Sequence, residues 1–350
     1  MIRRVYEHVS PIAALGIVIV VLMAANAVVE AHAGSITVEN SAARLERRQA
    51  AREGRLSLPL PGTPDTEAPL SRLASVGVKL GARTMIRVFK AESEFEVWVQ
   101  KDGAYVHFAT YPVCFWSGKL GPKLREGDRQ TPEGFYSITS EQLHFGDRWQ
   151  RSLDIGFPNV FDRINGRTGS VILVHGGCDS SGCFAMTNKV SEEIYEIVAA
   201  SLRSGQQYVP VHVFPFRMSA ENIAAQAGEV WSEFWSDLRQ GYESFERTRL
   251  PPVVSVCGKR YRVEDAAAGR SEDTGVELCP ADAIAFGAAN ATPISSKGDG
   301  EARAKSTALR KRASVSHACS MARASCRRWV ALRGQKMAGN FTAGRRHASR

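Results

Sequence analysis

His175 and Cys183 lie in the stretch of this sequence that best combines the parts of a thiol enzyme. The apolar run Val171–Val174, predicted as a central strand buried on both faces, ends at His175, and a turn containing glycines leads to Cys183. An amphipathic helix, predicted over Lys189–Leu202, begins a few residues later. A cysteine nucleophile reacts as its thiolate and needs a base or a positive environment. The pattern therefore predicts Cys183 as nucleophile and His175 as its base.

The turn between these two residues offers backbone groups that such a reaction needs. Glycine lets backbone N–H groups approach a substrate carbonyl closely and form an oxyanion hole. The residues predicted to bind the oxyanion or to orient the dyad are Gly176, Gly177, Ser181 and Gly182, and Ser180 is predicted to contact the substrate.

Other uses of these cysteines stay open at this point. His175, Cys178 and Cys183 could bind a metal with Cys114 or His212 as a fourth ligand, but the spacing H-x2-C-x4-C is not a standard structural zinc pattern. Cys178 could pair with Cys183, although so small a ring is sterically awkward. It could also pair with Cys114 or be the nucleophile itself. No metal and no cofactor is predicted.

The N-terminus predicts export. Arg3 and Arg4 precede the apolar run Ile12–Val29, and Ala31-His32-Ala33 is a cleavage site of the A-x-A type. Residues 1–33 are therefore predicted as a signal peptide or, because the run is long, as an N-terminal membrane anchor. The body is expected in the periplasm or cell envelope, where disulfides form. With seven cysteines, a monomer keeps at least one thiol unpaired.

The net charge of +9 belongs to the C-terminal end of the chain. Residues 297–350 hold 14 Lys and Arg against two acidic residues, a net +12, which leaves −3 on residues 1–296. A basic tail can contact nucleic acid, anionic lipid or an anionic wall polymer. The composition of residues 264–350 instead favours a solvated, disordered extension, and no nucleic-acid partner is predicted.

Composition divides the rest of the chain. Residues 34–77 are predicted as a Pro-rich linker, because four prolines between positions 59 and 69 favour an extended spacer, with a short helix compatible around positions 42–52. Residues 78–263 are predicted as the catalytic domain, and residues 264–350 as the tail.

The domain is predicted to be mainly β with α-helices. Asp102-Gly103 is a strong hairpin signal. No regular alternation of strand and crossover helix runs through residues 80–175, which favours antiparallel pairs over a doubly wound sheet. Strands are predicted over Met85–Phe89, Phe95–Val99, Tyr105–Tyr111, Val113–Trp116, Phe135–Ile138, Val209–Phe214, Val253–Val256 and Tyr261–Val263. Two helices follow Leu202, one capped by Ser219 and one carrying Trp231, Phe234, Trp235 and Leu238.

Two motifs in order resemble the L,D-transpeptidase catalytic-domain family (YkuD-type). Val174-His175-Gly176 followed by Ser180-Ser181-Gly182-Cys183 is similar to its His-Gly and Ser/Thr-His-Gly-Cys signature. Gly127 to Tyr136, with Thr131-Pro132-Glu133-Gly134, resembles the turn and strand upstream of its active site. The resemblance covers about residues 83–218 and implies a β-sandwich-like catalytic core with helices packed after the cysteine.

One branch of the family, the murein L,D-transpeptidases of YafK-like type, is more similar still. It shares the short loop between His and Cys, and the similarity then extends to about Val263. Three further motifs carry it, namely Ser117 to Lys123, Ile155–Asn159 and Pro215–Met218.

This chain departs from the family pattern at two positions near the cysteine. Ser181 replaces a His and cannot act as a base, and Ala185 replaces an Arg or Asn. A cation for the substrate carboxylate must then come from elsewhere. The basic residues predicted to supply it are Lys119, Lys123, Arg125 and Arg129.

The resemblance implies acyl transfer on peptidoglycan stem peptides. Cys183 would attack the carbonyl of the third residue, D-Ala would leave, and a thioester would form. The carbonyl of Gly176 or Gly177 would orient His175. An amine acceptor gives a cross-link or attaches a protein to the wall, whereas water gives an amidase that releases a wall-bound outer-membrane lipoprotein. The remaining alternative is a non-catalytic wall-binding module, and the membrane is a partner only through an N-terminal anchor.

Overall fold

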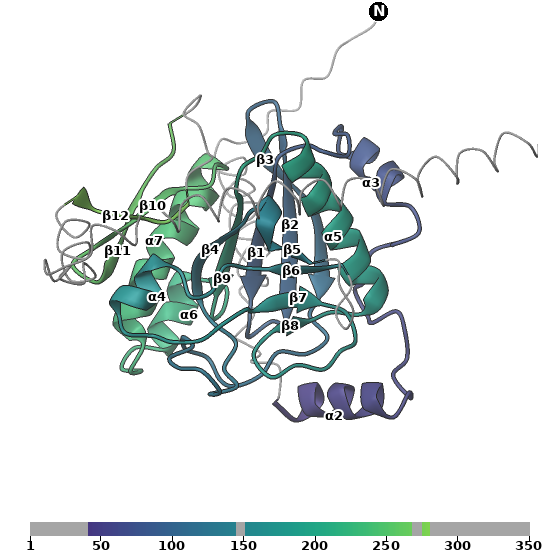
Figure 1. Ribbon diagram of the computed structural model, residues 1–350, viewed down its shortest axis with the longest axis horizontal. Helices are drawn as coiled ribbons and strands as arrows, with labels where there is room; N and C mark the ends of the chain where they lie inside the picture. The colour runs from purple at the N-terminus through teal and green to yellow at the C-terminus, as the bar shows by residue number, and fades with distance from the viewer. Residues whose placement is uncertain (1–40, 145–150, 268–274, 281–350) are drawn as a thin grey trace, which may run out of the picture. The chain divides into compact units, whose positions relative to one another are not determined.

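A five-stranded mixed sheet forms the centre of the fold (Figure 1). The computed structural model of the chain describes residues 41–144, 151–267 and 275–280. The strands lie in the order β3-β2-β1-β9-β4, and only β1 and β9 are parallel neighbours. Their bounds are β1 Thr84–Phe89, β2 Glu94–Lys101, β3 Ala104–Pro112, β4 Gly134–Ile138 and β9 Val209–Phe214.

The strand predictions for this sheet are confirmed. Asp102 and Gly103 form the turn between β2 and β3 with φ angles of 50° and 85°, in the left-handed region that these residue types tolerate. All six residues of β9 are buried, His212 among them, and the strand lies between β1 and β4 in the sheet.

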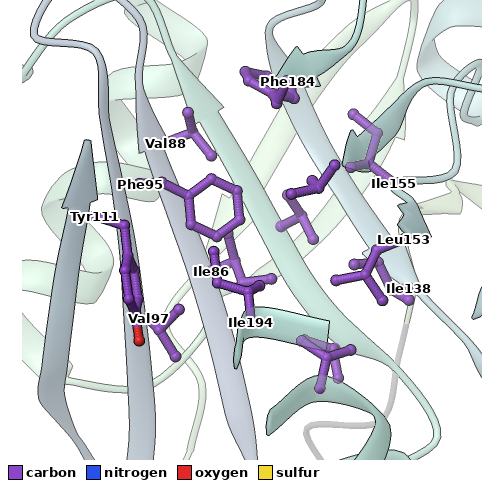
Figure 2. Packing of buried hydrophobic residues seen from close by; sticks show 14 of the residues in the cluster. Ile86, Val88, Phe95, Val97, Tyr111, Ile138, Leu153, Ile155, Phe184 and Ile194 are labelled. Carbon is purple, nitrogen blue, oxygen red and sulfur yellow. The ribbon is translucent and has the colours of Figure 1, made fainter. Parts of the chain in front are cut away.

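A smaller sheet lies against the first. Its strands are β5 Leu143–His144, β6 Ser152–Asp154, β7 Leu173–His175 and β8 Phe184–Ala185, in that order. Leu153, Ile155 and Phe184 from this side share one core with Ile86 and Phe95 of the central sheet (Figure 2). The predicted β-rich, sandwich-like fold with helices is confirmed.

One further strand prediction is confirmed in part and one is wrong. Val171–Val174 overlaps β7, which lies between β6 and β8 and ends at His175, but β7 belongs to the small sheet and the Val171 side chain is 48 % exposed, so the run is not buried on both faces. Val113–Trp116 is no strand, and only Phe115 forms an isolated bridge, to Ala185. Its four side chains are all buried, and a short apolar run alone does not distinguish such a buried segment from a strand.

Helix α5, Asn188–Arg203, follows the predicted helix closely and packs against strands of both sheets. Ile194 on its buried face joins the shared core (Figure 2). Three further helices contribute to a second core around Phe161, Phe234 and Tyr261, whose rings stack. They are α4 Val160–Ile164, α6 Ala220–Ala225, capped by Ser219, and α7 Ser232–Thr248, with Phe234, Trp235 and Leu238 buried as predicted.

The folded chain extends beyond the predicted end of the domain at residue 263. Strand β10, Val253–Cys257, pairs with β11, Arg260–Glu264, and also with β12, Glu277–Leu278. Cys257 and Cys279 form a disulfide beside β12. The prediction of a tail from residue 264 is therefore wrong for residues 275–280, while residues 281–350 lie outside the described chain.

The segment predicted as an extended linker also packs against the domain. It contains α2, Ser41–Arg52, and α3, Pro69–Ser75. Leu73 is buried in the shared core, and Arg72 forms an ion pair with Glu193 of α5 at 2.6 Å. The linker prediction is thus wrong for residues 41–77. Within the described ranges, no helix is both long and apolar enough to cross a membrane, and the predicted signal segment, residues 1–33, lies outside them.

A buried ammonium group anchors the long loop between β3 and β4. Lys90, at the end of β1, donates at 3.0 Å to the carbonyl oxygens of Lys119, Gly121 and Thr131. It also pairs with the Glu133 carboxylate at 2.8 Å, and both side chains are fully buried. Four oxygens around one ammonium replace the water that burial removes.

Replacing Lys90 by Met should cost about 3–5 kcal/mol of the free energy of unfolding, because the Glu133 carboxylate would remain buried without its cation. Urea unfolding followed by tryptophan fluorescence measures this cost. Lys119→Met is the matched control, because the Lys119 side chain is exposed. Equal costs for the two variants would contradict the assignment of Lys90 as an anchor.

Candidate active site

The register of β7 and β8 brings His175 and Cys183 together. The two strands are parallel, with Val174 opposite Phe184 and His175 opposite Ala185. Continuing this register one residue back sets Cys183 opposite Leu173, and the Leu173 N–H indeed donates to the Cys183 sulfur at 3.2 Å. Residues 173 and 175 point to one face of the sheet, so the imidazole and the thiol are diagonal neighbours on that face.

The turn between the two strands depends on glycine. Gly182 has φ 138°, a backbone conformation that other residue types rarely adopt. A Cβ at Gly176 would lie 2.4 Å from the Asn188 side-chain oxygen at the start of α5. Ser180 closes the turn, because its hydroxyl donates to the Cys183 carbonyl at 2.8 Å and accepts from the Gly182 N–H at 3.2 Å.

The His175 imidazole has a defined orientation. Its Nδ1 lies 2.6 Å from the carbonyl oxygen of Gly176. A carbonyl only accepts, so Nδ1 carries the proton and Nε2 of the neutral ring is left as the basic nitrogen. Gly176 is thus the residue of the turn whose carbonyl orients the ring.

Burial favours the neutral forms of both groups. It lowers the pKa of His175, against the opposing effects of the Gly176 carbonyl and the Asp179 charge. It raises the pKa of the Cys183 thiol, and Asp154 adds to this, while the Leu173 N–H, Lys123 and Ser180 act in the opposite direction. A neutral thiol beside a neutral imidazole can pass a proton when a substrate arrives.

The disulfides decide between the alternatives for the cysteines. Cys114 and Cys178 are bonded to each other, with Cα atoms 5.2 Å apart. Cys178 therefore neither pairs with Cys183 nor acts as nucleophile, and the proposed metal set loses two thiolates. Among the described cysteines, Cys183 alone is free, and it is partly exposed. His212, the other suggested ligand, is buried on β9 against the Phe135 ring, and burial lowers its pKa to about 3.

The four basic side chains predicted to bind substrate lie on the loop that Lys90 anchors. Those of Lys119, Arg125 and Arg129 are exposed. Lys123 is buried, pairs with Asp128 at 2.6 Å and donates to the Arg125 carbonyl. Its ammonium therefore shapes the loop. Ser180 is likewise engaged within its own turn, whereas Ser181 is exposed.

Sequence reasoning missed Asp154. It lies opposite Leu173 on β6, so Asp154, Leu173 and Cys183 form a row across three strands, on the face that carries His175. The carboxylate accepts from the Gly156 N–H at 3.0 Å, and burial raises its pKa. The only sequence feature that could have indicated Asp154 is its position just before the Ile155–Asn159 motif. Its relation to the thiol is visible only in the strand register.

Comparison with known proteins agrees with this geometry. The model of the L,D-transpeptidase catalytic domain (YkuD) matches residues 83–213. YafK of Escherichia coli strain K12, whose name assigns it to the L,D-transpeptidases, is 41 % identical over 184 residues, or 53 % of this chain and 75 % of YafK. The chain belongs to the L,D-transpeptidase catalytic-domain family. Membership supports a transpeptidase activity related to peptidoglycan.

The solved structures that resemble this chain have a lower sequence identity to it than YafK has. A mutant of the helical cell shape determining protein Pgp2 from Campylobacter jejuni is 19 % identical, with a TM-score of 0.31, and the match covers 54 % of this chain and 69 % of that one. Bd1075 of Bdellovibrio bacteriovorus is 20 % identical, with a TM-score of 0.27, over 47 % and 60 % of the two chains. Scores this low add nothing to the assignment.

Removing the Asp154 charge should make Cys183 more reactive. The carboxylate raises the pKa of the thiol, so Asp154→Asn should lower that pKa and increase the thiolate fraction at neutral pH. We expect alkylation of Cys183 by iodoacetamide at pH 7 to become about two- to five-fold faster, as followed by mass spectrometry of its tryptic peptide.

Asp102→Asn is the control, because Asp102 lies exposed in the hairpin turn of the central sheet. An alkylation rate that is unchanged in Asp154→Asn would mean that its charge does not act on the thiol.

Proposed function

We propose that this chain is a cysteine-dependent L,D-transpeptidase that acts on peptidoglycan stem peptides in the cell envelope. The observation that carries the proposal is the free thiol of Cys183, held on the same sheet face as an imidazole whose Nδ1 is bound to the Gly176 carbonyl. This arrangement leaves Nε2 as a base for the thiol. Metal ions and organic cofactors have no role in the proposed steps.

The reaction begins from the neutral pair. His175 Nε2 takes the thiol proton as the Cys183 sulfur attacks the carbonyl of the third residue of a stem peptide. The tetrahedral intermediate then collapses, the imidazolium gives its proton to the leaving amine of D-Ala, and a thioester remains on Cys183. In the second half, His175 takes a proton from the acceptor amine as it attacks the thioester. The tetrahedral intermediate collapses to the new amide, and the departing Cys183 sulfur takes the proton back from the imidazolium, which restores the neutral pair.

The oxyanion of each tetrahedral intermediate needs donors in the turn. The Gly182 N–H is engaged by Ser180 at 3.2 Å, so we assign this role to the N–H groups of Cys183 and Ser181. Gly182 and Gly177 contribute through the shape of the turn, since both have positive φ angles. Ser180 holds the nucleophile in place by binding the Cys183 carbonyl.

The exposed cations of the Lys90-anchored loop are the proposed site for substrate carboxylates. Ala185 is directly opposite His175 and supplies no cation where the family pattern has Arg or Asn. Lys119 and Arg125 can supply a cation from the loop, whereas the Lys123 ammonium already forms an ion pair with Asp128. Arg129 is exposed on the same loop and completes the set.

Neutralising two of the three exposed loop cations should weaken substrate binding without altering the chemical step. For Lys119→Gln/Arg125→Gln, we expect KM for a tetrapeptide donor to rise about three- to ten-fold with kcat nearly unchanged. Lys79→Gln, a change at an exposed lysine near α3, is the charge control. A fall in kcat at constant KM would contradict a role in ground-state binding.

Product analysis tests the function itself. The full chain, in wild-type, Cys183→Ala and His175→Ala forms, is incubated with sacculi that carry a covalently attached lipoprotein, and the muropeptides are separated by mass. We expect new cross-links between third-position residues, or exchange of the terminal D-Ala, in the wild type only. Each mutant should lose at least about 100-fold of this activity.

Two other outcomes would replace the proposal. Release of lipoprotein stubs without new cross-links would identify water as acceptor and the chain as an amidase. Identical peptides from wild type and both mutants would leave a non-catalytic wall-binding role.

A further inference from the structure

Helix α2 lies across the segment that supports the catalytic turn. The Arg44 guanidinium stacks 3.4 Å from the Trp116 ring centroid and donates to the Trp116 carbonyl at 3.0 Å. Arg47 donates to the Cys114 carbonyl at 3.1 Å. Figure 1 shows α2 at the lower edge of the molecule, below β8. Phe115 forms a bridge to Ala185 of β8, the strand that begins directly after Cys183. Helix α2 therefore packs against the segment that lies beside this strand.

The same helix also reaches the turn directly. Asp179 lies between His175 and Cys183, and its carboxylate forms ion pairs with both Arg48 and Arg52. Arg52 binds both carboxylate oxygens, through Nε at 2.9 Å and Nη2 at 3.2 Å. Two arginines on one carboxylate, one of them bidentate, restrict the position of the turn more than a single surface pair does.

The disulfide joins these two contacts into one unit. It links Cys114, under Arg47, to Cys178, the residue before Asp179. Leu60, which follows α2, is buried against it. The turn is therefore held covalently on one side and by the arginines of α2 on the other.

We propose that α2 belongs to the catalytic unit and that Arg48 and Arg52, by holding Asp179, position the turn that carries the base and the nucleophile. The inference rests on the proposed function for the roles of His175 and Cys183. Arg48, Arg52 and Asp179 act through that turn and do not contact the reacting atoms, so they are positioning residues.

The charge of Asp179 provides a readout that packing alone would not produce. Asp179 raises the pKa of His175, and Arg48 and Arg52 partly neutralise it. Among the described residues, the charged groups that act on the Cys183 thiol are Asp154 on β6 and Lys123 on the loop. These two remain unchanged in the variants described next.

The test measures the titration midpoint of His175 in the full chain, by exchange of its imidazole C2 proton in peptide-resolved mass spectrometry. In Arg48→Gln/Arg52→Gln the bare Asp179 charge should raise the midpoint by roughly half a pH unit, and in Asp179→Asn the midpoint should fall by a similar amount. Transfer activity should fall about ten-fold or more in both variants, because the turn, still tied by the Cys114–Cys178 disulfide, no longer holds base and nucleophile in one fixed geometry.

The control is Arg55→Gln/Arg239→Gln, which removes two arginines that pair with Glu53 and Glu243 away from the turn. Loss of packing alone would expose His175 and raise its midpoint in both test variants, so shifts in the same direction would overturn the proposal. Midpoints equal to the control would do so too. If the double variant fails to fold, Arg52→Gln carries the same expected sign, since that side chain is 56 % exposed.

The midpoints need no wall substrate. Opposite shifts combined with inactive sacculus assays would therefore support the positioning by α2 and reject the transpeptidase, so failure of one proposal is distinguishable from failure of the other.

Discussion

The Lys90 ammonium determines where the long loop before β4 can lie. A charged amine without water is costly unless oxygens surround it, and these come from one carboxylate and three carbonyls in two stretches of the loop, residues 119–121 and 131–133. Glu133 in turn accepts from Trp235 of α7 at 2.8 Å. The pair therefore joins the central sheet, the loop and the second core, and a shift of any one of them would leave a buried charge without its partner.

The proposed site is built on the opposite principle, because its two reactive groups are kept neutral. Burial disfavours both thiolate and imidazolium, and the Asp154 carboxylate opposes the thiolate further. Such a pair does not hold a permanently activated nucleophile. Activation must accompany substrate binding, when the attack on the carbonyl moves the negative charge from sulfur to the oxyanion and its N–H donors.

Sequence reasoning could propose the dyad because its chemistry is local. His175, the turn and Cys183 are close in the chain, and the hairpin at Asp102 is equally local. It failed where tertiary contacts decide. Positions 41–77 read as a spacer because prolines dominate, yet Leu73 and Arg72 find partners on α5 and the core. Asp154 and Asp179 escaped notice for the same reason, since their roles depend on residues across a sheet or about 130 positions away.

The two departures from the family pattern have a structural consequence that links the loop to the turn. Ala185 faces the same side of the sheet as His175 and is fully buried, so β8 presents no charge to a substrate. Ser181 cannot act as a second base beside His175. Substrate carboxylates are then recognised by the exposed cations of the loop, whose position depends on Lys90. The positions of the base and the nucleophile depend on the turn, which the disulfide and the arginines of α2 hold in place. Binding and reaction thus depend on two anchored segments that are joined directly, by the Cys114–Cys178 disulfide and by the bridge between Phe115 and Ala185.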